Sequence, residues 1–241
     1  MVGTGPGDVA DLSPRAYQAI RQAGVVVGYK TYIRLIASLL SPAQEIISTG
    51  MTREVERCRE AIRRAQDGKT VVLVSSGDPG VYGMAGLVLE MLEREGLLDA
   101  LEVEVIPGIT SATAAAAKLG APLMHDFAVI SLSDLLTPWA LIEKRLSLAA
   151  RGDFVLVLYN PASNKRTGQL ARAREIILSH KSPDTPVGIV RNACREGETL
   201  VVTDLEHLPE HAVDMLSIVI VGNRDTRRAG RFLVTPRGYR L

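Results

Sequence analysis

Short apolar runs along the chain alternate with segments in which apolar residues recur roughly every three to four positions. In the first half, the runs typical of strands cover Val25–Gly28, Glu45–Ser48, Thr70–Ser75 and Glu102–Ile106. The segments with helical periodicity cover Pro14–Ala23, Arg53–Asp67, Val81–Glu95 and Thr110–Leu119. Strands that alternate with helices build parallel sheets, so the pattern predicts an α/β fold with a largely parallel sheet.

The second half of the chain shows the same alternation with one difference. Its strand-like runs cover Phe127–Ser131, Phe154–Tyr159, Val187–Arg191, Thr199–Thr203 and Ser217–Val221. Its helical segments cover Pro138–Ala149 and Arg166–Leu178. Glu196 and Gly197 form a turn signal between two neighbouring strands, which predicts a hairpin and therefore a mixed sheet. We expect the arginine-rich tail from Arg224 onward to be exposed.

A break in the middle of the chain predicts two domains. The alanine-rich helical segment ends at Gly120, and Ala121 and Pro122 interrupt any helix there. We therefore expect one α/β domain over residues 1–117 and a second over residues 118–241. A chain of 241 residues is long enough for two small domains with separate cores.

Composition narrows the class of protein. Hydrophobic residues make up 46% of the chain and charged residues 23%, and no apolar run reaches the length of a membrane span. The net charge of +1 provides no overall field for nucleic acid. Two cysteines are too few for a disulfide framework, and the chain opens on a glycine loop rather than a signal peptide. These features predict a cytoplasmic protein that binds neither a membrane nor nucleic acid.

The first glycine loop, Gly3–Asp8, differs from a dinucleotide-binding fingerprint. Pro6 removes a backbone donor, and Asp8 places a negative charge where a phosphate would bind. The following helix begins only at Pro14. A ligand that carries adenosine without phosphate, together with a sulfonium cation, suits this loop, and a purely structural turn explains it equally well.

Two further loops favour the ligand interpretation. Ser75–Gly83 follows a strong apolar strand, and Ile106–Ala112 also joins a strand end to a helix. Loops at the carboxyl ends of parallel strands are where α/β proteins bind ligands. The three loops together predict a binding site in this half of the chain.

The three loops resemble the motifs of the tetrapyrrole (corrin/porphyrin) methylase family. The matching segments, in order, are Gly3–Asp8, Gly77-Asp78-Pro79 and Pro107-Gly108-Ile109-Thr110. The resemblance extends over essentially the whole chain. It implies two α/β domains with S-adenosyl-L-methionine (SAM) bound in the cleft between them, S-adenosyl-L-homocysteine as product, and a homodimer.

Further segments resemble the branch of this family that methylates C17 of precorrin-3B and contracts the ring in cobalamin biosynthesis. They are Gly28–Tyr32, Ser75–Gly83, His125–Phe127, Ile130–Trp139, Leu158–Pro161 and Val221–Asn223. The resemblance implies a small-molecule tetrapyrrole substrate and leaves open whether cobalt is already bound in it. Some relatives carry an iron–sulfur domain, for which this chain lacks the cysteines.

The resemblance also implies the residues that contact SAM, many of them through the backbone. They are Pro6, Gly77, Asp78, Val81, Thr110, Ser111, Ala112, Tyr159, Asn160, Asn192 and Ala193. Ring contraction requires proton transfers, so we also expect a general acid or base. The candidates are His125, Asp126 and Asp134. The alternative for His125 and Asp126 is a loop-capping pair, and for Asp134 it is a cap on the helix from Pro138.

Other side chains have two possible roles. Tyr29, Lys30 and Tyr82 are candidates to line the macrocycle site, and Arg191 and Arg195 are candidates to bind its propionates. The alternatives are ordinary packing for the tyrosines and solvent exposure for the cations. Asp78 has the alternative of a hydrogen bond within its own turn. His207 and His211 have a metal-like spacing, but Pro209 interrupts it, so we predict no metal site.

Two competing functions remain. The first is another methylase of the same fold, because such an enzyme would share the three loops. Examples are the precorrin-4 C11-methyltransferase and relatives that act on a diphthine precursor or on ribosomal RNA. The segments Ser131–Trp139 and Gly28–Tyr32 favour the C17 branch instead. A non-catalytic nucleotide-binding module would require phosphate-type glycine spacing and an acidic ribose contact, which the sequence lacks.

Overall fold

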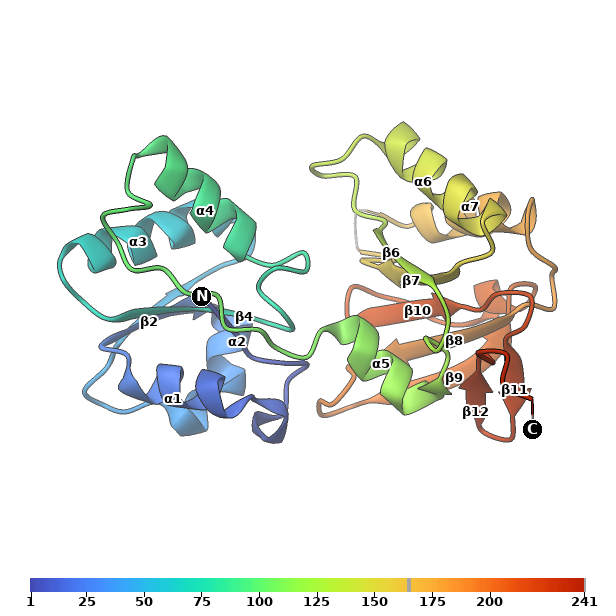
Figure 1. Cartoon of the computed structure of the whole chain (residues 1–241), viewed down its shortest axis with the longest axis horizontal. Coiled ribbons are helices and arrows are strands. Elements are labelled where there is room, and N and C mark those ends of the chain that lie inside the picture. Colours follow the sequence, from blue (N-terminus) through green and yellow to red (C-terminus); the bar gives the residue numbers. More distant parts are fainter. Residues whose placement is uncertain (164–165, 241) are drawn as a thin grey trace. The chain divides into compact units, whose positions relative to one another are not determined.

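The computed structural model describes residues 1–163 and 166–240, and the chain divides into two compact units, Met1–Ser111 and Ala112–Leu241 (Figure 1). The division precedes the expected boundary after residue 117. Helix α5 (Ser111–Leu119) accounts for the difference, because its small apolar residues pack into a core of the second unit. Each unit is described by itself below.

The first unit contains a four-stranded parallel sheet in the order β1-β4-β2-β3. The strands are β1 (Val2–Gly3), β2 (Val25–Tyr29), β3 (Glu45–Thr49) and β4 (Val71–Ser75). The strands predicted at the positions of β2, β3 and β4 are confirmed to within one residue at each end. Their carboxyl ends share one edge of the sheet, which is where all three glycine loops begin.

Helices cover both faces of this sheet (Figure 1). Along β2, Val26 packs with residues of α1 (Pro14–Gln22), while Val25 and Val27 pack with residues of α3 (Glu54–Gln66) and α4 (Ala85–Arg94). This alternation follows from the two-residue period of a strand. The remaining helical elements are α2 (Lys30–Leu35), η1 (Val9–Asp11) and η2 (Ala37–Leu39).

Two predictions for the first unit were wrong. Glu102–Ile106 forms no strand, and its one bridge joins Ile106 to Val2 of β1. The helix expected from Val81 begins at Ala85. Tyr82 has a left-handed backbone with φ of 52°, which no helix accommodates.

The second unit contains a five-stranded mixed sheet in the order β6-β7-β10-β8-β9. The strands are β6 (Phe127–Ser131), β7 (Val155–Tyr159), β8 (Pro186–Arg191), β9 (Thr199–Asp204) and β10 (Ser217–Val221). The antiparallel pairing of β8 with β9 confirms the predicted hairpin. Since β7 and β8 are both antiparallel to β10, and β6 is parallel to β7, the carboxyl ends of β6, β7 and β8 meet at one edge.

Helix α5 covers one face of this sheet, and α6 (Trp139–Arg151) with α7 (Gln169–Leu178) covers the other (Figure 1). A glycine on β8 lets α5 approach closely, because a Cβ at Gly188 would lie 2.4 Å from Cδ1 of Leu119. The close approach of α5 depends on this glycine.

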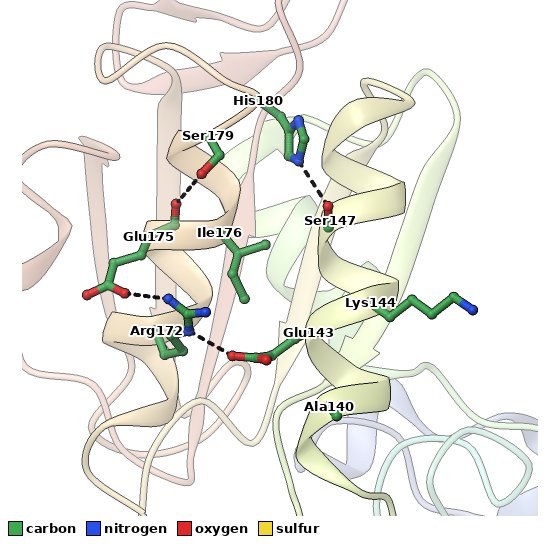
Figure 2. Close-up of a pocket in the computed structure, with 9 residues that line it drawn as sticks. All are labelled: Ala140, Glu143, Lys144, Ser147, Arg172, Glu175, Ile176, Ser179 and His180. Atoms are coloured by element: carbon green, nitrogen blue, oxygen red, sulfur yellow. Dashed lines mark hydrogen bonds and ion pairs between the residues drawn. The ribbon is translucent and has the colours of Figure 1, made fainter.

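A surface groove of about 470 Å³ lies between α6 and α7 (Figure 2). Figure 2 shows Arg172 bridging the two helices, with its Nε 2.7 Å from Glu143 and its Nη1 3.0 Å from Glu175. Ser147 Oγ and His180 Nε2 lie 3.0 Å apart at the other end of the groove. None of the predicted site residues lines this groove.

The C-terminal tail is more ordered than the sequence suggested. It forms β11 (Arg227–Ala229) and β12 (Phe232–Val234), and β12 pairs in parallel with β5 (Gly120–Ala121). The arginines of β11 are exposed as expected, but Leu233 and Thr235 are buried. The exposure predicted for the whole tail was therefore wrong.

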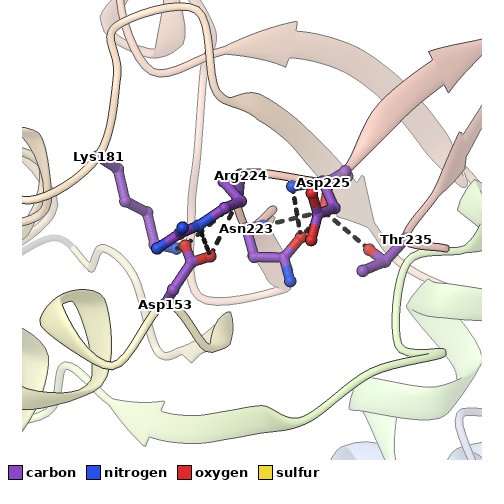
Figure 3. A network of polar contacts seen from close by, with 7 residues as sticks. Asp153, Lys181, Asn223, Arg224, Asp225 and Thr235 are labelled. Atoms are coloured by element: carbon purple, nitrogen blue, oxygen red, sulfur yellow. Dashed lines mark hydrogen bonds and ion pairs between the residues drawn. The ribbon is translucent and has the colours of Figure 1, made fainter. Parts of the chain in front are cut away.

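A polar network holds the start of this tail (Figure 3). Asp153 accepts hydrogen bonds from buried Lys181 Nζ at 2.9 Å and from Arg224 Nε at 2.8 Å. Thr226 Oγ1 and Thr235 Oγ1 lie 2.8 Å apart, joining the turn after β10 to the end of β12. Burial would by itself raise the pKa of Asp153, but the Lys181 and Arg224 bonds outweigh it and hold the pKa below its usual value.

Candidate cofactor and substrate site

The glycine loops of the first unit are joined through their backbones. Thr4 N donates to Ser75 O at 2.8 Å. Gly5 and Gly77 exchange two hydrogen bonds, at 3.2 Å from Gly5 N and 2.7 Å from Gly77 N. The first and second loops therefore lie side by side at the carboxyl edge of the sheet.

The third loop packs against the other two so closely that only glycine fits. A Cβ at Gly108 would lie 2.3 Å from Gly77 O, and a Cβ at Gly3 would lie 2.6 Å from Gly108 N. Gly77 also has a φ of 68°, which favours glycine. Backbone packing thus explains three glycines that the sequence showed only as a motif.

Asp78 links the second loop to the third. Its Oδ1 accepts from Gly80 N at 2.8 Å and its Oδ2 accepts from Gly108 N at 3.1 Å. The hydrogen bond within its own turn is confirmed, and the second bond adds a role that the sequence did not indicate. Asp8 acts locally, because its Oδ1 accepts from Ala10 N at 2.9 Å and caps η1.

The charge on these loops suits a cationic ligand. Across residues 3–12, 75–84 and 106–112 the charged side chains are Asp8, Asp11 and Asp78, and none is lysine or arginine. Phosphate sites instead need donors and positive charge. The acidic side chains match a cationic ligand such as a sulfonium in sign, and the loops lack the positive charge of a nucleotide-phosphate site. The predicted SAM contacts on these loops differ in exposure. Pro6 is buried, Val81 is exposed, and Thr110 and Ser111 are half-buried.

Tyr29 lies over a buried arginine that the sequence analysis missed. Tyr29 packs edge-on against Tyr32, with ring centroids 5.2 Å apart, and the Arg57 guanidinium lies 5.8 Å from the Tyr29 ring. Arg57 is only 3% exposed and donates from Nε to Thr49 Oγ1 at 2.8 Å and from Nη2 to Gly50 O at 2.9 Å. Its cation is thus satisfied without a carboxylate.

The other two macrocycle candidates of the first unit are at its surface. Lys30 is the first residue of α2 and is exposed. Tyr82 is also exposed, on the loop after β4. Both lie on segments that leave the carboxyl edge of the sheet, as does Tyr29.

The second unit gathers several predicted SAM contacts at the shared carboxyl edge of β6, β7 and β8. Asn160 has a left-handed φ of 51°, and its Nδ2 donates to Ser131 Oγ at 2.9 Å. Tyr159 Oη accepts from Ala112 N at 2.8 Å, at the start of α5. Asn192 follows β8 with a φ of 52° and donates from its backbone to Leu216 O at 3.0 Å. The next residue, Ala193, is buried in the core beneath α5.

The structure does not bring His125 and Asp126 to this edge. They precede β6, whose five residues span roughly 16 Å before Ser131 is reached. Asp126 N donates to His125 Nδ1 at 2.9 Å, and both side chains are exposed. They behave as a loop pair at the opposite edge of the sheet.

Asp134 lies beyond the carboxyl end of β6, at the same edge as Asn160. It does not cap α6, whose N-cap is Pro138 with no side-chain hydrogen bond, so the capping interpretation was wrong. Its Oδ2 instead accepts from Gln169 Nε2, at the start of α7, at 3.2 Å.

The two arginine candidates at the end of β8 differ. Arg191 Nε donates to Asp214 Oδ2 at 2.7 Å. Burial would raise the pKa of Asp214, but Arg191 and the Leu216 N–H outweigh it and lower the pKa. Arg191 is thus committed to an internal partner. Arg195 is half-buried, and its backbone N–H bonds to Asn192 O at 2.9 Å.

The described ranges, 1–163 and 166–240, hold neither a metal-type cluster nor a membrane-spanning helix. No three histidine, cysteine or acidic side chains cluster there as they would around a metal ion. None of the helices there is long and apolar enough to cross a membrane. His207 and His211 flank η3 (Leu208–Glu210), and the His207 Nδ1 bonds to Asp204 Oδ1 at 2.8 Å.

The fold and the three linked loops define a class of α/β protein with glycine loops at the carboxyl edge of a parallel sheet. Residues 1–209 match the family of tetrapyrrole (corrin/porphyrin) methylases, and the chain belongs to this family. The resemblance and the α/β fold expected from the sequence are confirmed.

Two curated proteins with similar sequences are methyltransferases that act on cobalt-factor III by name. The chain is 51% identical over 241 residues to the cobalt-factor III methyltransferase of Priestia megaterium, covering 99% of this chain but only 44% of that protein. It is also 51% identical to the probable cobalt-factor III C(17)-methyltransferase of Salmonella typhimurium, covering 100% of this chain and 99% of that protein. The chain thus spans less than half of the first relative and almost all of the second.

Solved structures of methyltransferases share the fold of this chain. The crystal structure of the methyltransferase CobJ matches with a TM-score of 0.92 at 40% identity, over 98% of each chain. A uroporphyrin-III C-methyl transferase from Thermus thermophilus, complexed with S-adenosyl homocysteine, matches with a TM-score of 0.69 at 28% identity over 92% of this chain and 95% of that one.

Proposed function

We propose that this chain is a SAM-dependent C-methyltransferase of cobalamin biosynthesis. It methylates C17 of precorrin-3B, or of the cobalt-containing equivalent, with contraction of the ring. The observation that carries the proposal is the 51% identity to the probable cobalt-factor III C(17)-methyltransferase of Salmonella typhimurium, which this chain matches over 99% of that protein's length.

The chain's own residues account for how such a cofactor is held. SAM, when bound, supplies a methyl group activated on a sulfonium. Asp78 fixes the backbone of the second and third loops, so that their carbonyls are oriented before the ligand arrives. The loops carry carboxylates and no cation, which favours a positively charged ligand. In the second unit, Asn160 and Asn192 have left-handed backbones at the ends of β7 and β8. We propose that these fixed backbone conformations orient the contacts that the two residues make with the cofactor.

Positioning is the main contribution that methyl transfer requires of a protein, and it can supply about 7–11 kcal/mol in ideal cases. We propose that the loop after β6 helps to position the macrocycle. Leu135 is 77% exposed and Leu136 is 98% exposed. They lie in Ile130–Trp139, the segment that resembles the C17 branch, and an exposed apolar pair suits the face of a planar macrocycle.

Ring contraction requires an acid or base near the macrocycle. Asp134 adjoins Leu135 at the carboxyl edge of β6, whereas His125 and Asp126 lie at the opposite edge. We therefore favour Asp134 for this role. A homodimer in the cytoplasm remains part of the proposal, and sedimentation of the purified protein tests the dimer.

Two measurements test the proposed function. Calorimetry of the purified protein should show binding of S-adenosylhomocysteine, and a protein that does not bind it overturns the proposal. Incubation with SAM and either precorrin-3B or cobalt-factor III, followed by mass spectrometry, should show one added methyl group and a contracted ring. Methylation without contraction, or methylation only of precorrin-4, assigns the chain to another branch of the family.

A further inference from the structure

Three basic side chains in the described part of the chain are buried, and two of them are satisfied. Lys181 pairs with Asp153. Arg57 donates to Thr49 and Gly50 and lies against the Tyr29 ring. The third, Arg166, is 7% exposed and has no carboxylate partner among the described residues.

Arg166 lies in the loop between β7 and α7. Its backbone pairs with Ser163, and its Nε lies 3.3 Å from Ser163 Oγ. Its Nη2 lies 3.5 Å from the sulfur of Met215, which is a weak acceptor. Its Nη1 is buried and makes no hydrogen bond within the described chain.

The acidic residue beside Met215 does not neutralise this guanidinium. Asp214 Oδ2 accepts from Arg191 Nε at 2.7 Å. Asp214 Oδ1 accepts from Leu216 N at 2.9 Å and from Ser217 Oγ at 3.0 Å. Both oxygens of Asp214 are thus occupied by other donors.

A guanidinium carries a fixed positive charge in proteins. Among the described residues, a hydroxyl and a thioether are the side-chain groups that contact this charge, and such an environment is unfavourable for folding. Selection tolerates such a cost where a ligand supplies the missing charge. A planar carboxylate matches the two Nη groups of an arginine.

We propose that Arg166 binds a carboxylate of a ligand, an inference that rests on the proposed function. Arg166 follows Tyr159 and Asn160, which the family resemblance places against SAM, and Met215 precedes β10 at the same edge. Met215 is exposed and lies over the guanidinium, and a flexible thioether is easily displaced. The carboxylate belongs either to the amino-acid end of the cofactor or to a side chain of the macrocycle.

The test compares Arg166→Met, which keeps the bulk and removes the charge, with Arg166→Lys. Arg145→Met, at an exposed position on α6, is the matched control. For each protein we would measure thermal stability without ligand, affinity for S-adenosylhomocysteine, affinity for 5′-methylthioadenosine, which lacks the carboxylate, and KM for the macrocycle. Arg166→Met should be as stable as the wild type or more so, because the unpaired charge is gone.

Two results support the proposal and identify the source of the carboxylate. A loss of about tenfold or more in affinity for S-adenosylhomocysteine, with 5′-methylthioadenosine unaffected, assigns it to the cofactor. A rise of similar size in KM for the macrocycle, with cofactor affinity unchanged, assigns it to the substrate. Arg166→Lys should lie between wild type and Arg166→Met in either case.

The proposal is overturned if Arg166→Met lowers stability while both affinities and KM stay at wild-type values, because the residue is then structural. If Arg166→Met does not fold, Arg166→Lys decides by the same ligand measurements. A wild-type protein that fails to bind S-adenosylhomocysteine overturns the proposed function itself. That result is distinct from a failure confined to the Arg166 variants.

Discussion

The Asp78 carboxylate accepts a hydrogen bond from the backbone N–H of Gly108, 30 residues further along the chain, at 3.1 Å. With the bond to Gly80 N it holds the second and third loops in one arrangement. Asp78→Ala should lower the free energy of unfolding by about 1–3 kcal/mol, because two backbone donors lose a charged acceptor. It should also weaken S-adenosylhomocysteine binding. Denaturant unfolding and calorimetry measure the two effects, with exposed Asp99→Ala as control.

Gly108→Ala should be more damaging to the loops than its small size suggests. The added Cβ would lie 2.3 Å from Gly77 O, so the backbone must shift, at a cost of about 1–3 kcal/mol. Gly86→Ala on α4 is the matched control, because nothing lies within 4 Å of its Cβ and the helix should gain about 0.5–1 kcal/mol. Equal melting temperatures for the two variants would contradict the close approach of the loops.

The Asp153–Lys181 pair predicts a loss of stability in acid. The folded pKa of Asp153 is lowered, so its contribution is present above the unfolded pKa of about 3.9 and is lost as pH falls through the folded pKa. Asp153→Asn should flatten this part of the stability profile. Lys181→Met, which leaves Asp153 only its exposed Arg224 partner, should destabilise by about 3 kcal/mol. An acid profile unchanged in Asp153→Asn would show that other groups cause the loss.

The two cysteines should react with thiol reagents at very different rates. Burial raises the pKa of Cys58 to about 11, so its thiolate is scarce and inaccessible near neutral pH. Cys194 is half-buried and follows Ala193, a proposed SAM contact. Labelling should modify Cys194 alone in the folded protein, and S-adenosylhomocysteine should slow it. Cys194→Ser should abolish the fast phase, and a fast phase that survives would place the reactive thiol at Cys58.

The exposed leucines after β6 predict a substrate effect without a stability effect. Leu135→Ser with Leu136→Ser should raise KM for the macrocycle about a hundredfold or more, because the burial of two leucine side chains, roughly 1.5–3 kcal/mol each, is lost from the complex. S-adenosylhomocysteine affinity and thermal stability should not change. Leu148→Ser, at an exposed position on α6, is the control. A KM equal to the wild-type value would remove this loop from the macrocycle site.

Several features of the fold followed from the order of residues along the chain. The alternation of apolar runs and helical segments predicted β2, β3 and β4 and the helix α3, and Glu196-Gly197 predicted the β8–β9 hairpin, but α2 between β2 and β3 was not predicted. Ser13 and Pro14 marked the start of α1, where Ala16 N donates to Ser13 Oγ at 3.1 Å. These signals are local, because propensity, periodicity and capping depend on neighbours in sequence.

Tertiary structure alone decided which segments pair and which charges are buried. Glu102–Ile106 has the pattern of a strand but makes a single bridge, from Ile106 to Val2, while the tail after Arg224 pairs in parallel with β5. Asp134 and the pair His125–Asp126 flank the same strand, β6, and only its direction in the sheet puts Asp134 at the edge with Asn160. The burial of Arg57 and Arg166 was not predicted from the sequence. Hydrogen-bonded pairing and burial depend on residues far along the chain, and a linear pattern does not contain them.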